Sequence, residues 1–107
     1  MDKNQALIII KKFVKELKQE GISVDRAILY GSYAVGKEQR HSDIDVAIVS
    51  KDFGKDRVEE GIKLFRIAGK VDTRLEPIPI SVEAYEQETW VPLIYEIKVK
   101  GLELKMV

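Results

Sequence analysis

LYGSYAVGKEQRHSDIDVAIV, residues 29–49, is the stretch that decides the fold of this 107-residue chain. An apolar run over residues 27–30 meets a Gly-Ser pair, and a polar connector then leads to a second apolar run that opens with two aspartates. Successive side chains of a strand point to opposite faces, so Asp43 and Asp45 are predicted to share one face of the second strand. The stretch therefore predicts two strands joined by a polar connector, with paired carboxylates on one side.

Two carboxylates about 6 to 7 Å apart along a strand repel each other. A divalent cation between them removes that repulsion, and Mg²⁺ prefers such oxygen ligands and completes its shell with water and substrate phosphates. Gly31 lacks a Cβ, so a phosphate can approach its backbone, and Ser32 offers a hydroxyl and an N–H group. The residues thus indicate a site that handles a nucleoside triphosphate.

This pattern resembles the polymerase-β-like nucleotidyltransferase superfamily, and the short length resembles its minimal nucleotidyltransferase branch. The positions that carry the resemblance are Gly31, Ser32, Gly36, Ser42, Asp43 and Asp45. The resemblance implies an α/β (α+β) domain with a small mixed sheet backed by helices on one face, the palm-like fold of polymerase β. It also implies a two-ion Mg²⁺ site, ATP as the substrate, and nucleotide binding by Gly31, Ser32 and Ser42.

The family places a third acidic residue on a strand beside the Asp-x-Asp strand. Residues 71–80 are the candidate strand, in which Asp72, Arg74 and Glu76 would alternate onto one face. By its place at the start of this strand, Asp72 is the expected third metal ligand and catalytic residue, with Asp43 and Asp45. Glu76 lies on the same predicted face and remains the alternative.

The resemblance implies transfer of a nucleoside monophosphate, AMP from ATP, to a hydroxyl group. Minimal members are commonly paired with a HEPN-domain protein as toxin and antitoxin, so a tyrosine of such a partner is the expected acceptor. One alternative is a non-catalytic antitoxin that neutralises its partner by binding. Another is a small-molecule nucleotidyltransferase, which the absence of an acceptor-binding domain disfavours.

Length and composition predict the number of domains, the kind of partner and the cellular location. The length predicts a single domain over residues 1–107. Eighteen basic and eighteen acidic residues cancel, so no overall field attracts nucleic acid. The chain has no cysteine, no apolar run that could span a membrane and no secretory leader pattern, which predicts a cytoplasmic protein.

The rest of the chain alternates helices with strands. Helices are predicted over residues 4–20 with Asn4 as N-cap, within residues 32–40, over 57–68, over 82–88 after Ser81, and over 92–100. The predicted apolar side of the helix over 57–68 carries Val58, Ile62 and Phe65, with Leu64 or Ala68 as further members. A short strand is expected at residues 102–107. Ile8 and Ile9 widen the first helix's apolar stripe, which suggests contact with another subunit and hence a homo-oligomer.

Overall fold

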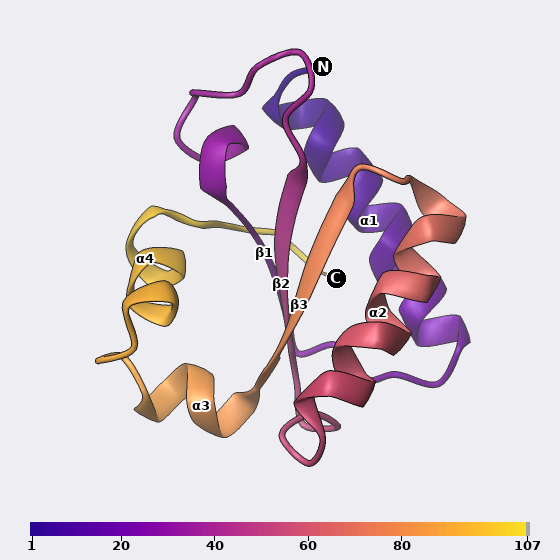
Figure 1. Ribbon diagram of the computed structural model, residues 1–107, viewed down its shortest axis with the longest axis vertical. Coiled ribbons are helices and arrows are strands. Elements are labelled where there is room, and N and C mark those ends of the chain that lie inside the picture. The colour runs from indigo at the N-terminus through magenta and orange to yellow at the C-terminus, as the bar shows by residue number, and fades with distance from the viewer. Residues whose placement is uncertain (107) are drawn as a thin grey trace.

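The computed structural model describes residues 1–106 and contains a four-stranded sheet with helices on both faces (Figure 1). The strands are β1 (Arg26–Tyr30), β2 (Ile44–Ser50), β3 (Leu75–Ser81) and β4 (Leu102–Glu103), in the spatial order β3-β2-β1-β4. β1 pairs antiparallel with both β2 and β4, whereas β2 and β3 are parallel. The small mixed sheet of an α+β protein is therefore confirmed.

Helices α1 (Lys3–Gln19) and α2 (Arg57–Val71) cover one face of the sheet. They pack on it because alternate strand residues point to this side. The largest core lies here and includes Ile10, Phe13, Leu17, Val46, Ile48, Leu64 and Ile67.

The N-cap of α1 is Asp2, whose side chain accepts a hydrogen bond from the N–H of Gln5 at 2.9 Å. In return, the side-chain oxygen of Gln5 accepts from the N–H of Asp2. The prediction of Asn4 as the cap was wrong because this reciprocal pair starts the helix two residues earlier.

The packing side of α2 also differs from the prediction. Leu64, Ile67 and Ala68 are buried, whereas Val58, Ile62 and Phe65 are 72%, 61% and 63% exposed. The helix carries two apolar stripes. The stripe that packs on the sheet contains Leu64 and Ala68, which were only further members of the predicted side, and Ile67, which was not predicted. The helix also continues through Gly69 to Val71 instead of ending at residue 68.

Helices were expected on one face of the sheet only, but the second face is also partly covered. Helices α3 (Val82–Gln87) and α4 (Pro92–Lys100) lie against it, and Figure 1 shows them opposite α1 and α2. Ile94 and Ile97 of α4 pack with residues of the central strands and form a second, smaller core. The Ser81 hydroxyl accepts from the N–H of Ala84 at 3.0 Å, which confirms Ser81 as an N-cap. Helices α3 and α4 therefore cover part of this face.

Three other boundaries differ from the predictions. The connector begins with a single 3-10 turn, η1 (Gly31–Tyr33), and holds no α-helix. The strand predicted over residues 71–80 begins at Leu75, because α2 occupies its first residue and a turn the next ones. The C-terminal strand is reduced to Leu102–Glu103, and residue 107 of its predicted range lies outside the described residues.

Within residues 1–106, no helix combines the length and apolar character needed to cross a membrane.

Candidate active site

Asp45 and Glu76 lie side by side on the face of the sheet that also carries α4. The parallel register of β2 and β3 pairs Asp45 with Glu76, and the next residues on the same side of each strand belong to the second core. Asp45 is half-buried and Glu76 is exposed. Asp43 stands just before β2, exposed and two residues from Asp45. The two strands thus place Asp45 beside Glu76, and Asp43 directly precedes one of these strands.

The electrostatic surroundings of Asp45 favour its neutral form. Burial raises the pKa of the Asp45 carboxyl, and the negative charges of Glu76 and Asp43 raise it further. A half-buried carboxylate beside two like charges is destabilised unless a cation approaches it. These three residues, the acidic corner, therefore have the charge pattern of a cation site.

Gly31 places the turn directly over Asp45. Its φ of +75° lies in the left-handed region that glycine adopts without strain. A Cβ built on Gly31 would overlap Oδ2 of Asp45 and stand 3.3 Å from its Cβ. The neighbouring residue Tyr30 is the antiparallel partner of Asp45 across β1 and β2. The Gly-Ser turn and the acidic corner are consequently parts of one site.

Replacing Gly31 with alanine should damage both stability and transfer. The left-handed backbone costs about 1–2 kcal/mol for a residue with a Cβ, and the methyl group would also displace the Asp45 carboxylate. Gly36→Ala is the matched control, since Gly36 has a φ of +72° but a Cβ there would meet nothing within 4 Å. Thermal melts should show destabilisation of both variants, whereas nucleotide transfer should fall about tenfold further in Gly31→Ala. Equal activity of the two variants would contradict the role of the Gly31–Asp45 contact.

The two serines predicted to bind nucleotide have different surroundings. Ser32 lies inside η1, directly after the glycine that contacts Asp45. The Ser42 hydroxyl accepts from the N–H of Gln39 at 2.7 Å, and the Ser42 N–H donates to the Gln39 carbonyl at 3.0 Å. Ser42 therefore closes the connector turn that leads into Asp43. Because η1 has only three residues, the connector supplies no long helix whose N-terminus could bind phosphate.

Asp72 does not stand on the strand that was predicted for it. It is the C-cap residue of α2, and its carboxylate accepts from the N–H, Nε and Nη2 of Arg74 at 2.9, 2.9 and 2.7 Å. These bonds hold the pKa of Asp72 below its ordinary value, even though partial burial opposes them. Asp72 is thus tied to a cation in the turn between α2 and β3, while Glu76 stands beside Asp45. The predicted alternation of residues 72, 74 and 76 fails because the first two precede the strand.

Two residues of this region escaped the sequence-based reasoning. Burial and the charges of Asp45, Glu76 and Glu96 raise the pKa of Tyr30 to about 12. Tyr30 packs against the second core, and its position in the strand before Gly31 also places it on the Asp45 face. Glu96 belongs to α4, and no local pattern connects it with a site some fifty residues earlier. The phenol of Tyr30 therefore remains protonated among three acidic residues from three elements.

The donor set suits a divalent metal ion, although its members are not drawn together as they stand. Among residues 1–106, no three acidic or histidine side chains converge closely enough to form a ready-made metal site. Carboxylate oxygens are nevertheless the ligands of Mg²⁺, and burial together with the charges of Glu76 and Asp43 raises the pKa of Asp45, so a nearby cation would stabilise its carboxylate. Asp43, Asp45 and Glu76 are the residues that could hold such an ion.

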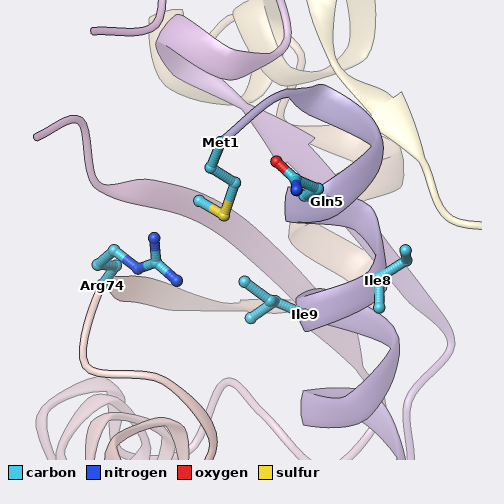
Figure 2. A pocket seen from close by; sticks show the side chains of 5 residues that line it. All are labelled: Met1, Gln5, Ile8, Ile9 and Arg74. Carbon is cyan, nitrogen blue, oxygen red and sulfur yellow. The ribbon is translucent and has the colours of Figure 1, made fainter. Parts of the chain in front are cut away.

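A hollow of about 390 Å³ lies elsewhere, beside the N-terminal half of α1. Its lining residues are Met1, Gln5, Ile8, Ile9 and Arg74. Figure 2 shows the Arg74 side chain extending toward Met1 and Ile9 across this hollow. It includes neither Asp45 nor Glu76, so the acidic corner is a surface site and not part of this depression.

Residues 10–103 match the model of the nucleotidyltransferase domain family, and the chain belongs to this family. It is 34% identical over 100 residues to the Methanocaldococcus jannaschii protein named "Putative protein adenylyltransferase MJ0141", covering 90% of this chain and 95% of that protein. The family resemblance inferred from the Gly-Ser and Asp-x-Asp motif is confirmed, and the chain is a nucleotidyltransferase.

Solved structures agree with this assignment. The fold matches a "putative nucleotidyltransferase" of Sulfolobus solfataricus with a TM-score of 0.67 and 17% identity, over 94% of this chain and 80% of that one. It also matches a chain of a toxin–antitoxin complex crystallised with AMP-PNP, with a TM-score of 0.61 and 25% identity, over 91% of this chain and 73% of that one. The first match supports the fold alone, and the second adds a relative that works in a toxin–antitoxin system.

Proposed function

We propose that this nucleotidyltransferase uses Mg²⁺ to transfer AMP from ATP to a hydroxyl group, namely a tyrosine of a HEPN-domain toxin partner, and so acts as an antitoxin. The observation that carries the proposal is the pairing of Asp45 with Glu76 directly beneath the Gly31 turn. This pairing puts carboxylates that could hold a metal-bound triphosphate next to a turn whose protein backbone a phosphate can approach. The adenylyltransferase and toxin–antitoxin relatives support the choice of AMP and of a protein acceptor.

In this proposal each residue has a defined task. Asp43 and Asp45 hold the metal ions, and Glu76 takes the third position that had been expected of Asp72, which Arg74 neutralises. Gly31 and Ser32 hold the triphosphate with backbone groups that a side chain would obstruct. Ser42 acts on the nucleotide site through the connector turn that it closes.

When bound, the metal ions would neutralise the negative charge that grows as the acceptor oxygen displaces pyrophosphate from the α-phosphorus. The carboxylates hold their positions because β2 and β3 are hydrogen-bonded strands of the sheet. Rigid placement of the reacting groups supplies much of the rate in such transfers. Because the corner opens to solvent and not into a cavity, a hydroxyl on a large acceptor can reach it.

The surface beside the corner fits a protein acceptor. Helix α4 lies on the same face of the sheet and exposes Leu93, Tyr95 and Val99, and Trp90 before it is 76% exposed. Ile94 of the same helix is buried in the second core and is not available for such a contact. Exposed apolar groups next to an active site are typical of contacts with another protein.

A transfer assay with two forms of labelled ATP tests the proposal. The chain is incubated with Mg²⁺ and a HEPN-domain protein, using ATP labelled at either the α- or the γ-phosphate. We expect label on the partner only from α-labelled ATP, loss of labelling with EDTA, and loss in Asp43→Asn/Asp45→Asn. Mutation of the labelled tyrosine to phenylalanine in the partner identifies the acceptor.

Other outcomes would replace the proposal. Label from γ-labelled ATP alone would mean phosphoryl transfer instead of nucleotidyl transfer. Absence of label, with partner binding unchanged in the double variant, would favour an antitoxin that acts by binding. Labelling of an added small alcohol or aminoglycoside but not of the partner would favour a small-molecule enzyme. The cytoplasmic location expected from the sequence belongs to the same proposal.

A further inference from the structure

A stripe of apolar side chains runs along the solvent side of α2. Val58, Ile62 and Phe65 are spaced four and three residues apart, and each is more than 60% exposed. The side chains that anchor the helix, Leu64 and Ile67, lie on a different side and are fully buried. Three large apolar side chains within about two helical turns form a patch of the kind that marks a protein contact.

Two glycines of α2 point to close approach by another chain. Gly61 and Gly69 lie within the helix, where each weakens it by about 1 kcal/mol relative to alanine. A Cβ at either position would meet nothing within 4 Å, so contacts within the chain do not require these glycines. Gly69 continues the stripe four residues after Phe65. A neighbouring helix packed on the stripe could approach the backbone closely at these two glycines.

We propose that this stripe is the interface of a homodimer, in which α2 packs antiparallel against α2 of a second copy about a two-fold axis. The stripe is complementary to itself about its centre. The midpoint between Ile62 and Phe65 is also the midpoint between Val58 and Gly69. Antiparallel pairing therefore sets Ile62 against Phe65 of the second copy, and Val58 against the space at its Gly69. Such self-complementarity is what an interface between identical chains requires.

The charges beside the stripe fit the same arrangement. Glu59 and Arg66 lie seven residues apart on one flank of α2, and antiparallel pairing brings Glu59 within about 3 Å, along the axis, of Arg66 of the second copy. Within the chain, Arg66 contacts Glu20 at 3.6 Å, and Lys70 contacts the same carboxylate at 3.3 Å. If Arg66 turned to the second copy, Lys70 would still neutralise Glu20.

The position of the stripe favours a second copy over the acceptor protein. Helix α2 covers the sheet face that carries Val46 and Ile48, whereas Asp45 and Glu76 face the other side. A protein held on the stripe would therefore sit on the side of the sheet away from the acidic corner of the same chain. Dimerisation through α2 leaves both active faces open. One helix per copy buries less than the roughly 1,200–2,000 Å² of a standard interface, so we expect a dissociation constant on the order of 10 µM.

Cysteine cross-linking tests the pairing because the natural chain has no cysteine. In the proposed dimer the two copies of residue 62 are offset by about 4.5 Å along the helix axis, whereas the two copies of residue 58 are offset by about 16 Å. Oxidation at about 100 µM, well above the expected dissociation constant, should therefore convert most of Ile62→Cys into a disulfide-linked dimer. Val58→Cys should stay at the level of Lys63→Cys, which lies away from the stripe. Equal cross-linking at positions 58 and 62 would overturn the antiparallel pairing.

Sedimentation equilibrium without nucleotide gives an independent test. Phe65→Glu should raise the dissociation constant at least tenfold, and Val99→Glu, an equally exposed site on α4, should leave it unchanged. Glu59→Arg should weaken the dimer, and Glu59→Arg/Arg66→Glu should restore it to within about threefold of the natural protein. A natural chain that is monomeric at about 200 µM would overturn the proposal. If Phe65→Glu then abolished binding of the HEPN protein, the stripe would belong to that partner.

Discussion

Asp45→Asn should abolish nucleotide transfer while making the folded protein more stable at neutral pH. The carboxylate is expected to hold the metal ion, and such charge stabilisation amounts to several kcal/mol in the transition state. At about 1.36 kcal/mol for each factor of ten, transfer should fall about a thousandfold or more. The assay is the transfer of label from α-labelled ATP, with Glu86→Gln on exposed α3 as the control for loss of a carboxylate elsewhere.

The gain in stability follows from the raised pKa of Asp45. Below the pKa of the unfolded chain, about 3.9, the carboxyl is protonated in both states and does not affect folding. As the pH rises through the higher pKa of the folded state, the unfolded chain is favoured because it ionises more readily. Asparagine removes this penalty.

Thermal melts at several pH values measure this effect. The melting temperature of Asp45→Asn should exceed that of the natural protein at pH 7, and the difference should vanish near pH 3, below the unfolded pKa of about 3.9. Added Mg²⁺ should stabilise the natural protein and act much less on Asp45→Asn. An Asp45→Asn protein that melts below the natural one at pH 7 would mean that Asp45 is a structural residue and not an unpaired charge of an active site.

Glu76→Gln and Asp72→Asn should have opposite effects, because only one of these carboxylates stands with Asp45. Glu76→Gln should reduce transfer about a hundredfold or more, since it removes a metal ligand, and should leave stability unchanged or increased. Asp72→Asn should retain transfer within about threefold and lower the free energy of unfolding by about 1–2 kcal/mol, since it weakens charge-assisted bonds to Arg74.

The pH dependence separates the two roles further. The pKa of Asp72 is lowered in the folded state. Its contribution to stability is therefore present above the unfolded pKa of about 3.9 and is lost as the pH falls through the lower folded pKa. The deficit of Asp72→Asn, measured by urea unfolding, should accordingly shrink below about pH 4. An Asp72→Asn protein with natural stability and no transfer would restore Asp72 as the third ligand.

Local sequence was sufficient to recognise the Gly-Ser and Asp-x-Asp motif. The period of two along a strand predicts that Asp43 and Asp45 share a face, and the Gly-Ser pair predicts a turn, because both depend on neighbours within a few residues. The confirmed family and the Ser81 cap rest on the same kind of local pattern, and the resemblance to the family implied the mixed sheet. The assignment of Asp43, Asp45, Gly31, Ser32 and Ser42 to the reaction itself remains a prediction.

Tertiary structure decided what depends on pairing between distant segments. Sequence offered Asp72 and Glu76 on one face, and the extension of α2 through Gly69 together with the parallel register of β2 and β3 placed only Glu76 beside Asp45. Periodicity also showed apolar residues on α2 without telling which stripe meets the sheet. The sheet took Leu64 and Ile67 and left Phe65 in solvent, because the direction from which a helix docks is set by the whole core and not by the helix alone.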